Sequence, residues 1–239
     1  ENSAREPEIV DLATFLNNMG AQIRGVGTDV IRITGVNSLQ SMNTHTIIAD
    51  RIESGTYLSL AAAMGDGVMI NNVIPEHLEA YTSKLIEMGV DLKIDSDKIY
   101  VPKAEHLTAV HVKTMPYPGF ATDLQQPLTP LMAKAAGVST VVDTIYPKRV
   151  KHIPELQKMG MKIAAGDGKI TIEHTDHFNG ADVEAGEIRA GASLVITGLM
   201  ADGQTVIHKA DNILRGYDRI VWKLNRLNAN VRIEDDEQD

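Results

Sequence analysis

Hydrophobic positions change spacing in a regular order along this chain. Apolar residues first recur at helical spacing between Ile9 and Met19, and Gly20 ends this run. Two short runs of alternating apolar residues follow within residues 21–33, joined by a glycine-rich turn. Because a strand rather than a helix follows Gly25-Val-Gly27, the pattern favours a hairpin turn over a nucleotide-binding loop.

The same order of helix end, strand, turn and strand is predicted again further along the chain. It recurs in residues 85–101 and 156–172, and a last copy in 224–233 stops after one strand. The equivalent positions, spaced by 69, 71 and 68 residues, are Met19, Met88, Met159 and Leu227. A period of this length indicates a pseudo-symmetric assembly of similar units.

A second pattern lies between these copies. Helices are predicted to begin near Ala49, Ala121 and Ala185, and each is followed by a short β run and a second helix. The unit is therefore β-α-β-α-β-β, present three times with half of another copy in front. Each helix has one apolar stripe that must be buried. We therefore expect an α/β fold with pseudo-threefold symmetry, with all six helices central and the sheets outside.

The half copy in front predicts a division of the chain into domains. We place the boundary near Ser41–His45, so that residues 1–44 are the tail of another domain and residues 45–233 form the three-repeat domain. The polar start without an initiator Met is typical of a chain entered in the middle. The acidic run in 234–239 is expected to be a solvated tail.

One stretch, residues 113–127, carries the main candidate for chemistry. Pro116, Pro118 and Gly119 make a stiff, bent entry, after which Thr122 can cap a helix with Asp123 in its first turn. The backbone then positions this carboxylate, and the helix N-terminus favours its ionised form. The alternative is that Asp123 serves only the start of the helix.

Aligning the repeats adds further polar groups at helix starts. One structural position is shared by Arg51, Asp123 and Glu187, and another by Glu53, Gln125 and Arg189. Equivalent helix N-termini lie near one end of the pseudo-axis and favour anions. A shared functional rim and plain capping chemistry at three helices both remain open.

Composition narrows the function classes. The net charge of −9 argues against a nucleic-acid or anionic-membrane partner, and the 239 residues include no cysteine and no apolar run long enough to span a bilayer. His174-Thr-Asp-His177 has a spacing that a metal site could use, but its place after a strand favours a solvated turn. No metal or cofactor is expected.

Five segments together resemble the UDP-N-acetylglucosamine enolpyruvyltransferase (1-carboxyvinyltransferase) family over essentially the whole chain. They are Glu1-Asn-Ser-Ala-Arg-Glu-Pro-Glu-Ile, Asp50-Arg-Ile-Glu-Ser-Gly-Thr, Pro116-Tyr-Pro-Gly-Phe-Ala-Thr-Asp-Leu-Gln, Arg189-Ala-Gly-Ala-Ser-Leu-Val and Arg215-Gly-Tyr-Asp. The resemblance implies two domains, each an inside-out α/β barrel of three β-α-β-α-β-β units. The shikimate-pathway enolpyruvyltransferase shares the fold but not these motifs.

The resemblance also implies a function. Family members transfer the enolpyruvyl group of phosphoenolpyruvate to the sugar 3′-hydroxyl through a tetrahedral intermediate and release phosphate. This is the first committed step of peptidoglycan synthesis in the cytoplasm, and it links the family to cell-wall biogenesis, cell shape and cell division. The implied partners are these two small molecules and the family's first half, with no nucleic acid or membrane.

Roles carry over to matching positions only. Asp123 matches the proposed general base that contacts the sugar hydroxyl, and Ile145 matches a backbone contact to UDP-N-acetylglucosamine. Arg215 matches the arginine that grips phosphoenolpyruvate as the domains close. The remaining substrate-side positions are Arg149, Glu187 and Arg189. Arginine suits both ligands because its paired donors match carboxylate and phosphate, although a surface ion pair is the alternative for each arginine.

The chain also departs from the family pattern. Ala121 replaces a proline, Glu187 replaces an aspartate, and Leu214 precedes Arg-Gly-Tyr where the family has aspartate. The family's first half, which carries a lysine–asparagine pair and a mobile loop with the general acid, is not in this sequence. We therefore expect the chain alone to be inactive. A truncated or degenerate relative that binds nucleotide sugars or regulates without catalysis is the alternative.

Overall fold

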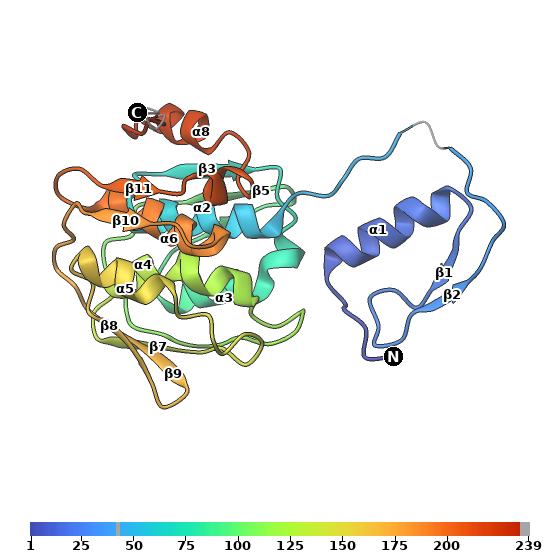
Figure 1. The fold of residues 1–239 in the computed structure, drawn as a ribbon, viewed down its shortest axis with the longest axis horizontal. Coiled ribbons are helices and arrows are strands. Elements are labelled where there is room, and N and C mark those ends of the chain that lie inside the picture. Colours follow the sequence, from blue (N-terminus) through green and yellow to red (C-terminus); the bar gives the residue numbers. More distant parts are fainter. Residues whose placement is uncertain (42–43, 235–239) are drawn as a thin grey trace.

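The computed structural model describes residues 1–41 and 44–234. The front of the chain forms α1 (Pro7–Asn18), β1 (Gln22–Arg24) and β2 (Arg32–Thr34), and the two strands pair antiparallel. The predicted helix and hairpin are therefore confirmed. Figure 1 shows them on one side of a larger body. Two residues of the predicted boundary, 42–43, and the last five of the acidic tail, 235–239, lie outside the described residues.

The middle repeat contains every element of the predicted unit. Its strands form one sheet in the order β6-β7-β9-β8, in which β6 and β7 are parallel and the other pairs are antiparallel. Its elements are β6 (His111–Lys113), the 3-10 helix η2 (Thr122–Leu124), α4 (Gln125–Lys134), β7 (Val138–Val142), α5 (His152–Lys158), β8 (Ile163–Gly166) and β9 (Lys169–Glu173).

The first repeat lacks its leading strand among the described residues. Its elements are α2 (Arg51–Met64), β3 (Val68–Asn71), η1 (Pro75–Leu78), α3 (Glu79–Glu87), β4 (Lys93–Ile94) and β5 (Lys98–Val101). The sheet order is β3-β5-β4. The segment before α2 runs toward α1 instead of along β3, and His45 there contacts Asp11 and Phe15. Without a neighbouring strand its backbone cannot form a ladder.

The third repeat ends early. Its elements are β10 (Asp182–Glu184), α6 (Ile188–Met200), β11 (Val206–His208), α7 (Asp211–Leu214) and α8 (Ile220–Arg226). The prediction of a strand within residues 224–233 is wrong. These residues pair with no strand among those that the structure describes. Asn225 still holds the backbone of Val231 through two hydrogen bonds, as Asn17 holds that of Ile23 in β1.

The repeat is visible in the backbone at the helix ends. The four residues predicted to be equivalent, Met19, Met88, Met159 and Leu227, are the C-caps of α1, α3, α5 and α8. Each is followed by a residue with positive φ, which is glycine three times and Asn228 in the last copy. Glycine and asparagine adopt this conformation most easily, and the four helix ends of the repeated pattern are therefore predicted correctly from the sequence.

The core lies where α2, α4 and α6 pack against one another inside the sheets (Figure 1). Gly55 of α2 packs closely on the end of η2, because a Cβ at this position would lie 2.5 Å from a methyl carbon of Leu124. The predicted α/β fold with central helices is confirmed for these three. The second helices, α3, α5 and α8, bury one face only, around Leu85, Leu156 and Leu224.

Truncating Leu128 tests this core. Its side chain is fully buried on α4, so Leu128→Ala is expected to lower the free energy of unfolding by about 2–5 kcal/mol. The matched control is Leu12→Ala, because the Leu12 side chain is 52% exposed and should cost less than about 1 kcal/mol. Urea denaturation of the three proteins measures both values. Equal losses for the two variants would contradict the assignment of the core.

Within the described part of the chain, no helix has both the length and the apolar character needed to cross a membrane.

Candidate active site

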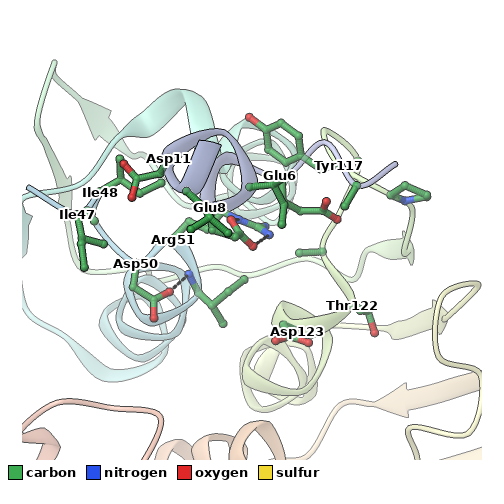
Figure 2. A pocket seen from close by; sticks show the side chains of 18 of the residues that line it. Glu6, Glu8, Asp11, Ile47, Ile48, Asp50, Arg51, Tyr117, Thr122 and Asp123 are labelled. Carbon is green, nitrogen blue, oxygen red and sulfur yellow. Dashed lines mark hydrogen bonds and ion pairs between the residues drawn. The ribbon is translucent and has the colours of Figure 1, made fainter. Parts of the chain in front are cut away.

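A cavity of about 1190 Å³ lies between α1 and the starts of the three central helices (Figure 2). One wall comes from α1 and from residues 44–49, which lead into α2. The opposite wall comes from the start of α2, the bent stretch 115–121 and the residues Thr122, Asp123, Ile145 and Arg189. Three of the predicted site residues therefore share this cavity.

Asp123 lies in the first turn of η2, as predicted, and two arginines hold its carboxylate. Arg149 donates from Nη1 to Oδ1 at 2.7 Å, and Arg189 donates from Nε to Oδ2 at 3.1 Å. Burial pushes the pKa of Asp123 up, but the hydrogen bond from Arg149 and the two positive charges outweigh it and hold the pKa below its usual range. The side chain remains 35% exposed, so an ionised acceptor is available at the cavity.

Arg189 has a second set of partners deeper in the molecule. Its Nη1 donates to the hydroxyl of Tyr217 at 3.3 Å, and its guanidinium lies 5.6 Å from the Tyr217 ring centre. The Tyr217 hydroxyl also bonds Thr56 of α2 at 3.0 Å. Tyr217 is 1% exposed. This chain of contacts connects α2, the segment before α8 and the start of α6 to the Asp123 carboxylate.

Thr122 does not cap the helix, which corrects the prediction. Ala121 occupies the cap position, and the Thr122 hydroxyl donates to Asp143 Oδ2 at 2.6 Å while it accepts from Arg149 Nη1 at 3.1 Å. The hydroxyl therefore binds the residue that follows β7 and does not bind a backbone N–H of the helix.

Ile145 lies in the turn that follows β7. Its side chain is 44% exposed and lines the cavity, and its backbone N–H donates to Asp143 at 3.0 Å. Arg149, later in the same turn, contributes through Asp123 and is not itself part of the cavity lining among the described residues.

Glu187 and Arg51 do not meet Asp123, so the aligned helix starts do not form one cluster. Arg51 donates to both carboxylate oxygens of Glu8 on α1, at 3.0 and 3.2 Å, and lies over the ring of Tyr117. Figure 2 shows Arg51 and Glu8 at the cavity wall. Glu187 instead accepts a hydrogen bond from Gln126 at 2.8 Å.

Arg215 lies outside the cavity lining. It is the C-cap of α7 and is exposed, and within the described ranges its side chain makes no hydrogen bond or ion pair. Its assignment to phosphoenolpyruvate stays a prediction.

His152 is a buried group that the sequence did not single out as important. Its Nδ1 lies 3.0 Å from Gln126 Nε2, and the side chain is fully buried. Burial and the charge of Arg149 lower the pKa of His152 to about 3. The ring is therefore neutral and accepts the amide N–H at Nδ1.

His152→Gln is expected to flatten the acid dependence of stability. The unfolded histidine binds a proton below about pH 6.5 and the folded one does not, so wild-type stability falls as the pH falls toward 3. The slope attributable to His152 approaches about 1.4 kcal/mol per pH unit. Urea denaturation across this range measures it. His208→Gln, at a 56% exposed histidine, is the control, and parallel curves for wild type and His152→Gln would contradict the assignment.

Among the described residues, His174 and His177 do not form a metal-binding cluster with other side chains. His174 bonds Asp176 at 3.0 Å and the carbonyl of Ala135 at 3.1 Å, in line with a turn. No cluster of three metal-ligating side chains occurs in residues 1–41 and 44–234.

Three further residues of the site were not named from sequence: Asp143, Tyr217 and Glu8. Asp143 carried a signal, because an aspartate directly after a β run commonly accepts from backbone N–H groups two and three residues on. Tyr217 and Glu8 act through partners far away in sequence, which spacing does not reveal.

Comparison with known proteins defines the class. The sequence model of the family described as EPSP synthase (3-phosphoshikimate 1-carboxyvinyltransferase) matches residues 1–236. The enolpyruvyl transferase NikO from Streptomyces tendae superposes with a TM-score of 0.84 at 27% identity, covering 95% of this chain and 54% of that one. EPSP synthase from Acinetobacter baumannii gives 0.68 at 20% identity, over 93% and 55%, which supports the fold alone. The chain belongs to the enolpyruvyltransferase family.

Curated relatives narrow the family to one group. UDP-N-acetylglucosamine 1-carboxyvinyltransferase 2 of Lactiplantibacillus plantarum is 63% identical over 238 residues, covering 100% of this chain and 56% of the relative. The UDP-N-acetylglucosamine 1-carboxyvinyltransferase of Lactobacillus johnsonii is 59% identical over 236 residues, covering 98% and 56%. These identities confirm the resemblance to this group, and the chain spans about half the length of the curated relatives it matches.

Proposed function

We propose that this chain is part of a transferase that moves the enolpyruvyl group of phosphoenolpyruvate to the 3′-hydroxyl of UDP-N-acetylglucosamine. The observation that carries the proposal is an ionised carboxylate, Asp123, held by two arginines at a large cavity. It occurs in a chain 63% identical to a relative named for this reaction. In this role the protein serves peptidoglycan synthesis in the cytoplasm, and thereby cell shape and division.

The proposed reaction needs only a weak base to accept the proton of the sugar 3′-hydroxyl. Protonation of the phosphoenolpyruvate methylene makes its C2 electron-poor, and the sugar 3′-oxygen then bonds to C2 and loses its proton. The C2–O bond to phosphate breaks next, and loss of a methyl proton restores the double bond. A carboxylate with a lowered pKa is a weak base, but a positioned acceptor suffices once the carbon is cationic. Asp123 meets this requirement in the ionised form.

The other site residues take binding roles in this proposal. The Ile145 backbone contacts the nucleotide sugar, while Arg149 and Arg189 keep Asp123 oriented and place positive charge beside the anionic substrates. Arg215 reaches phosphoenolpyruvate when the domain that contains residues 1–44 closes on the three-repeat domain. Glu187, which directly precedes α6, connects the start of that helix and its Arg189 to Gln126 of α4.

Phosphate release by the full-length protein, supplied with both substrates, tests the proposal. We expect release that depends on each substrate. Binding of UDP-N-acetylglucosamine without any phosphate release would favour the alternative, a non-catalytic nucleotide-sugar-binding or regulatory protein. The altered contexts at Glu187 and Leu214 are the features that favour this alternative.

A further inference from the structure

We propose that Asp143 is a positioning residue of this site, which sets the placement of the Ile145 backbone relative to the Asp123 carboxylate. Asp143 is 8% exposed and does not line the cavity among the described residues. It acts through its neighbours and does not touch substrate. This inference rests on the proposed function, because Ile145 and Asp123 are both proposed contacts to the nucleotide sugar.

The topology of the sheet places Asp143 between the two contacts. It directly follows β7, and Thr114 directly follows β6, its parallel neighbour. Parallel strands end at the same edge of a sheet, so the Thr114 hydroxyl donates to Asp143 Oδ1 at 2.7 Å. The same hydroxyl accepts from the N–H of Thr144 at 3.0 Å. The carboxylate is thereby anchored to the sheet.

One carboxylate oxygen shapes the turn that carries Ile145. Besides the Thr114 hydroxyl, Oδ1 accepts the backbone N–H of Ile145 at 3.0 Å and that of Tyr146 at 2.8 Å. These bonds fix the direction of the backbone after β7. The turn then continues to Arg149, whose guanidinium lies 5.3 Å from the Tyr146 ring centre.

The other oxygen reaches the Asp123 side of the cavity. Oδ2 accepts the Thr122 hydroxyl at 2.6 Å, and that hydroxyl accepts Arg149 Nη1 at 3.1 Å. The same Nη1 donates to Asp123 Oδ1 at 2.7 Å. Asp143 therefore connects the Ile145 turn to Asp123 through one hydroxyl and one guanidinium.

A carboxylate is the group that suits this position, because both oxygens act only as acceptors. Burial pushes the pKa of Asp143 up, but the hydrogen bonds from Thr122, Tyr146, Thr114 and Ile145 outweigh it and keep the pKa below its usual range. An asparagine in the same rotamer keeps the Oδ1 bonds but points an N–H₂ donor at the donating Thr122 hydroxyl. Asp143→Asn therefore separates the link to Asp123 from the folding of the turn.

The test uses the full-length transferase and steady-state kinetics with both substrates. Asp143→Asn is expected to lower kcat/KM about 10- to 100-fold, the range for losing a hydrogen bond to a charged group. The KM for the nucleotide sugar should rise more than the KM for phosphoenolpyruvate. Thr122→Val breaks the same link from the other end and should show the same pattern, whereas Thr122→Ser keeps the hydroxyl and should restore kcat/KM to within about threefold.

Non-additivity separates this role from a loss of folding. If both variants break one link, the Asp143→Asn/Thr122→Val double variant loses no more than about the larger single loss. Asp176→Asn, the same change at an exposed carboxylate, is the control and should match wild type. Multiplied losses, equal changes in the two KM values, or unchanged kinetics in Asp143→Asn would each overturn the inference. Absence of turnover in the wild type would instead overturn the proposed function, and this inference with it.

Discussion

Replacing Asp123 by asparagine is expected to lower kcat of the full-length transferase about 10²- to 10⁴-fold, the range for removing a positioned proton acceptor. The variant keeps the size of the side chain, but its single amide oxygen can accept from only one of Arg149 and Arg189, and the amide cannot take the proton of the sugar hydroxyl. Because the two arginines lower the pKa, the wild-type carboxylate stays ionised throughout the neutral range. The loss should therefore be independent of pH there.

Phosphate release at saturating substrates measures this effect. The matched control is again Asp176→Asn. The Asp176 carboxylate is 69% exposed, contacts His174 and is not among the residues that line the cavity. A variant at Asp123 that keeps more than about a tenth of wild-type kcat would show that another group accepts the proton.

The chain of 239 residues on its own is expected to turn over at least about 10³-fold more slowly than the full-length protein. Stabilising the charge that develops on a reacting group is worth about 10²–10³ per donor. Among the described residues, the two arginines that line the cavity, Arg51 and Arg189, are already paired with Glu8 and Asp123. The cavity wall also carries the carboxylates of Glu6, Glu8, Asp11 and Asp50. Such a wall repels anionic substrates unless further cations are supplied.

Side-by-side assays of phosphate release by the chain and the full-length protein, at equal concentration, test this expectation. Circular dichroism of the chain establishes that its helices are formed during the assay. Turnover by the folded chain within about tenfold of the full-length rate would mean that these residues already contain a complete site.

The repeat could be predicted from sequence because its signals are local. Met-Gly pairs at helix ends and alternating runs after them depend on φ preferences and on burial of one face. The strand expected after Leu227 was predicted from the same local pattern and is absent. A strand needs a partner, and the pattern around Val231 contains no information on whether one is present.

The site was predictable only in part. Asp123 was found because prolines, a glycine and a helix start surround it in sequence. Its ion pairs with Arg149 and Arg189 join residues 26 and 66 positions apart, and no local pattern specifies them. Alignment of the repeats placed Arg51, Asp123 and Glu187 at equivalent helix starts and left a shared functional rim open, but pseudo-symmetry relates backbone positions, while each side chain follows its own partner. Arg51 turns to Glu8 on α1, and Glu187 turns to Gln126.

Mass spectrometry of the nucleotide sugar tests the central claim most directly. The full-length protein is incubated with phosphoenolpyruvate and UDP-N-acetylglucosamine, and in parallel with shikimate 3-phosphate as the acceptor. The account predicts that UDP-N-acetylglucosamine gains one enolpyruvyl group as phosphate is released, and that shikimate 3-phosphate stays unmodified. Unmodified UDP-N-acetylglucosamine, or transfer to shikimate 3-phosphate instead, would contradict it.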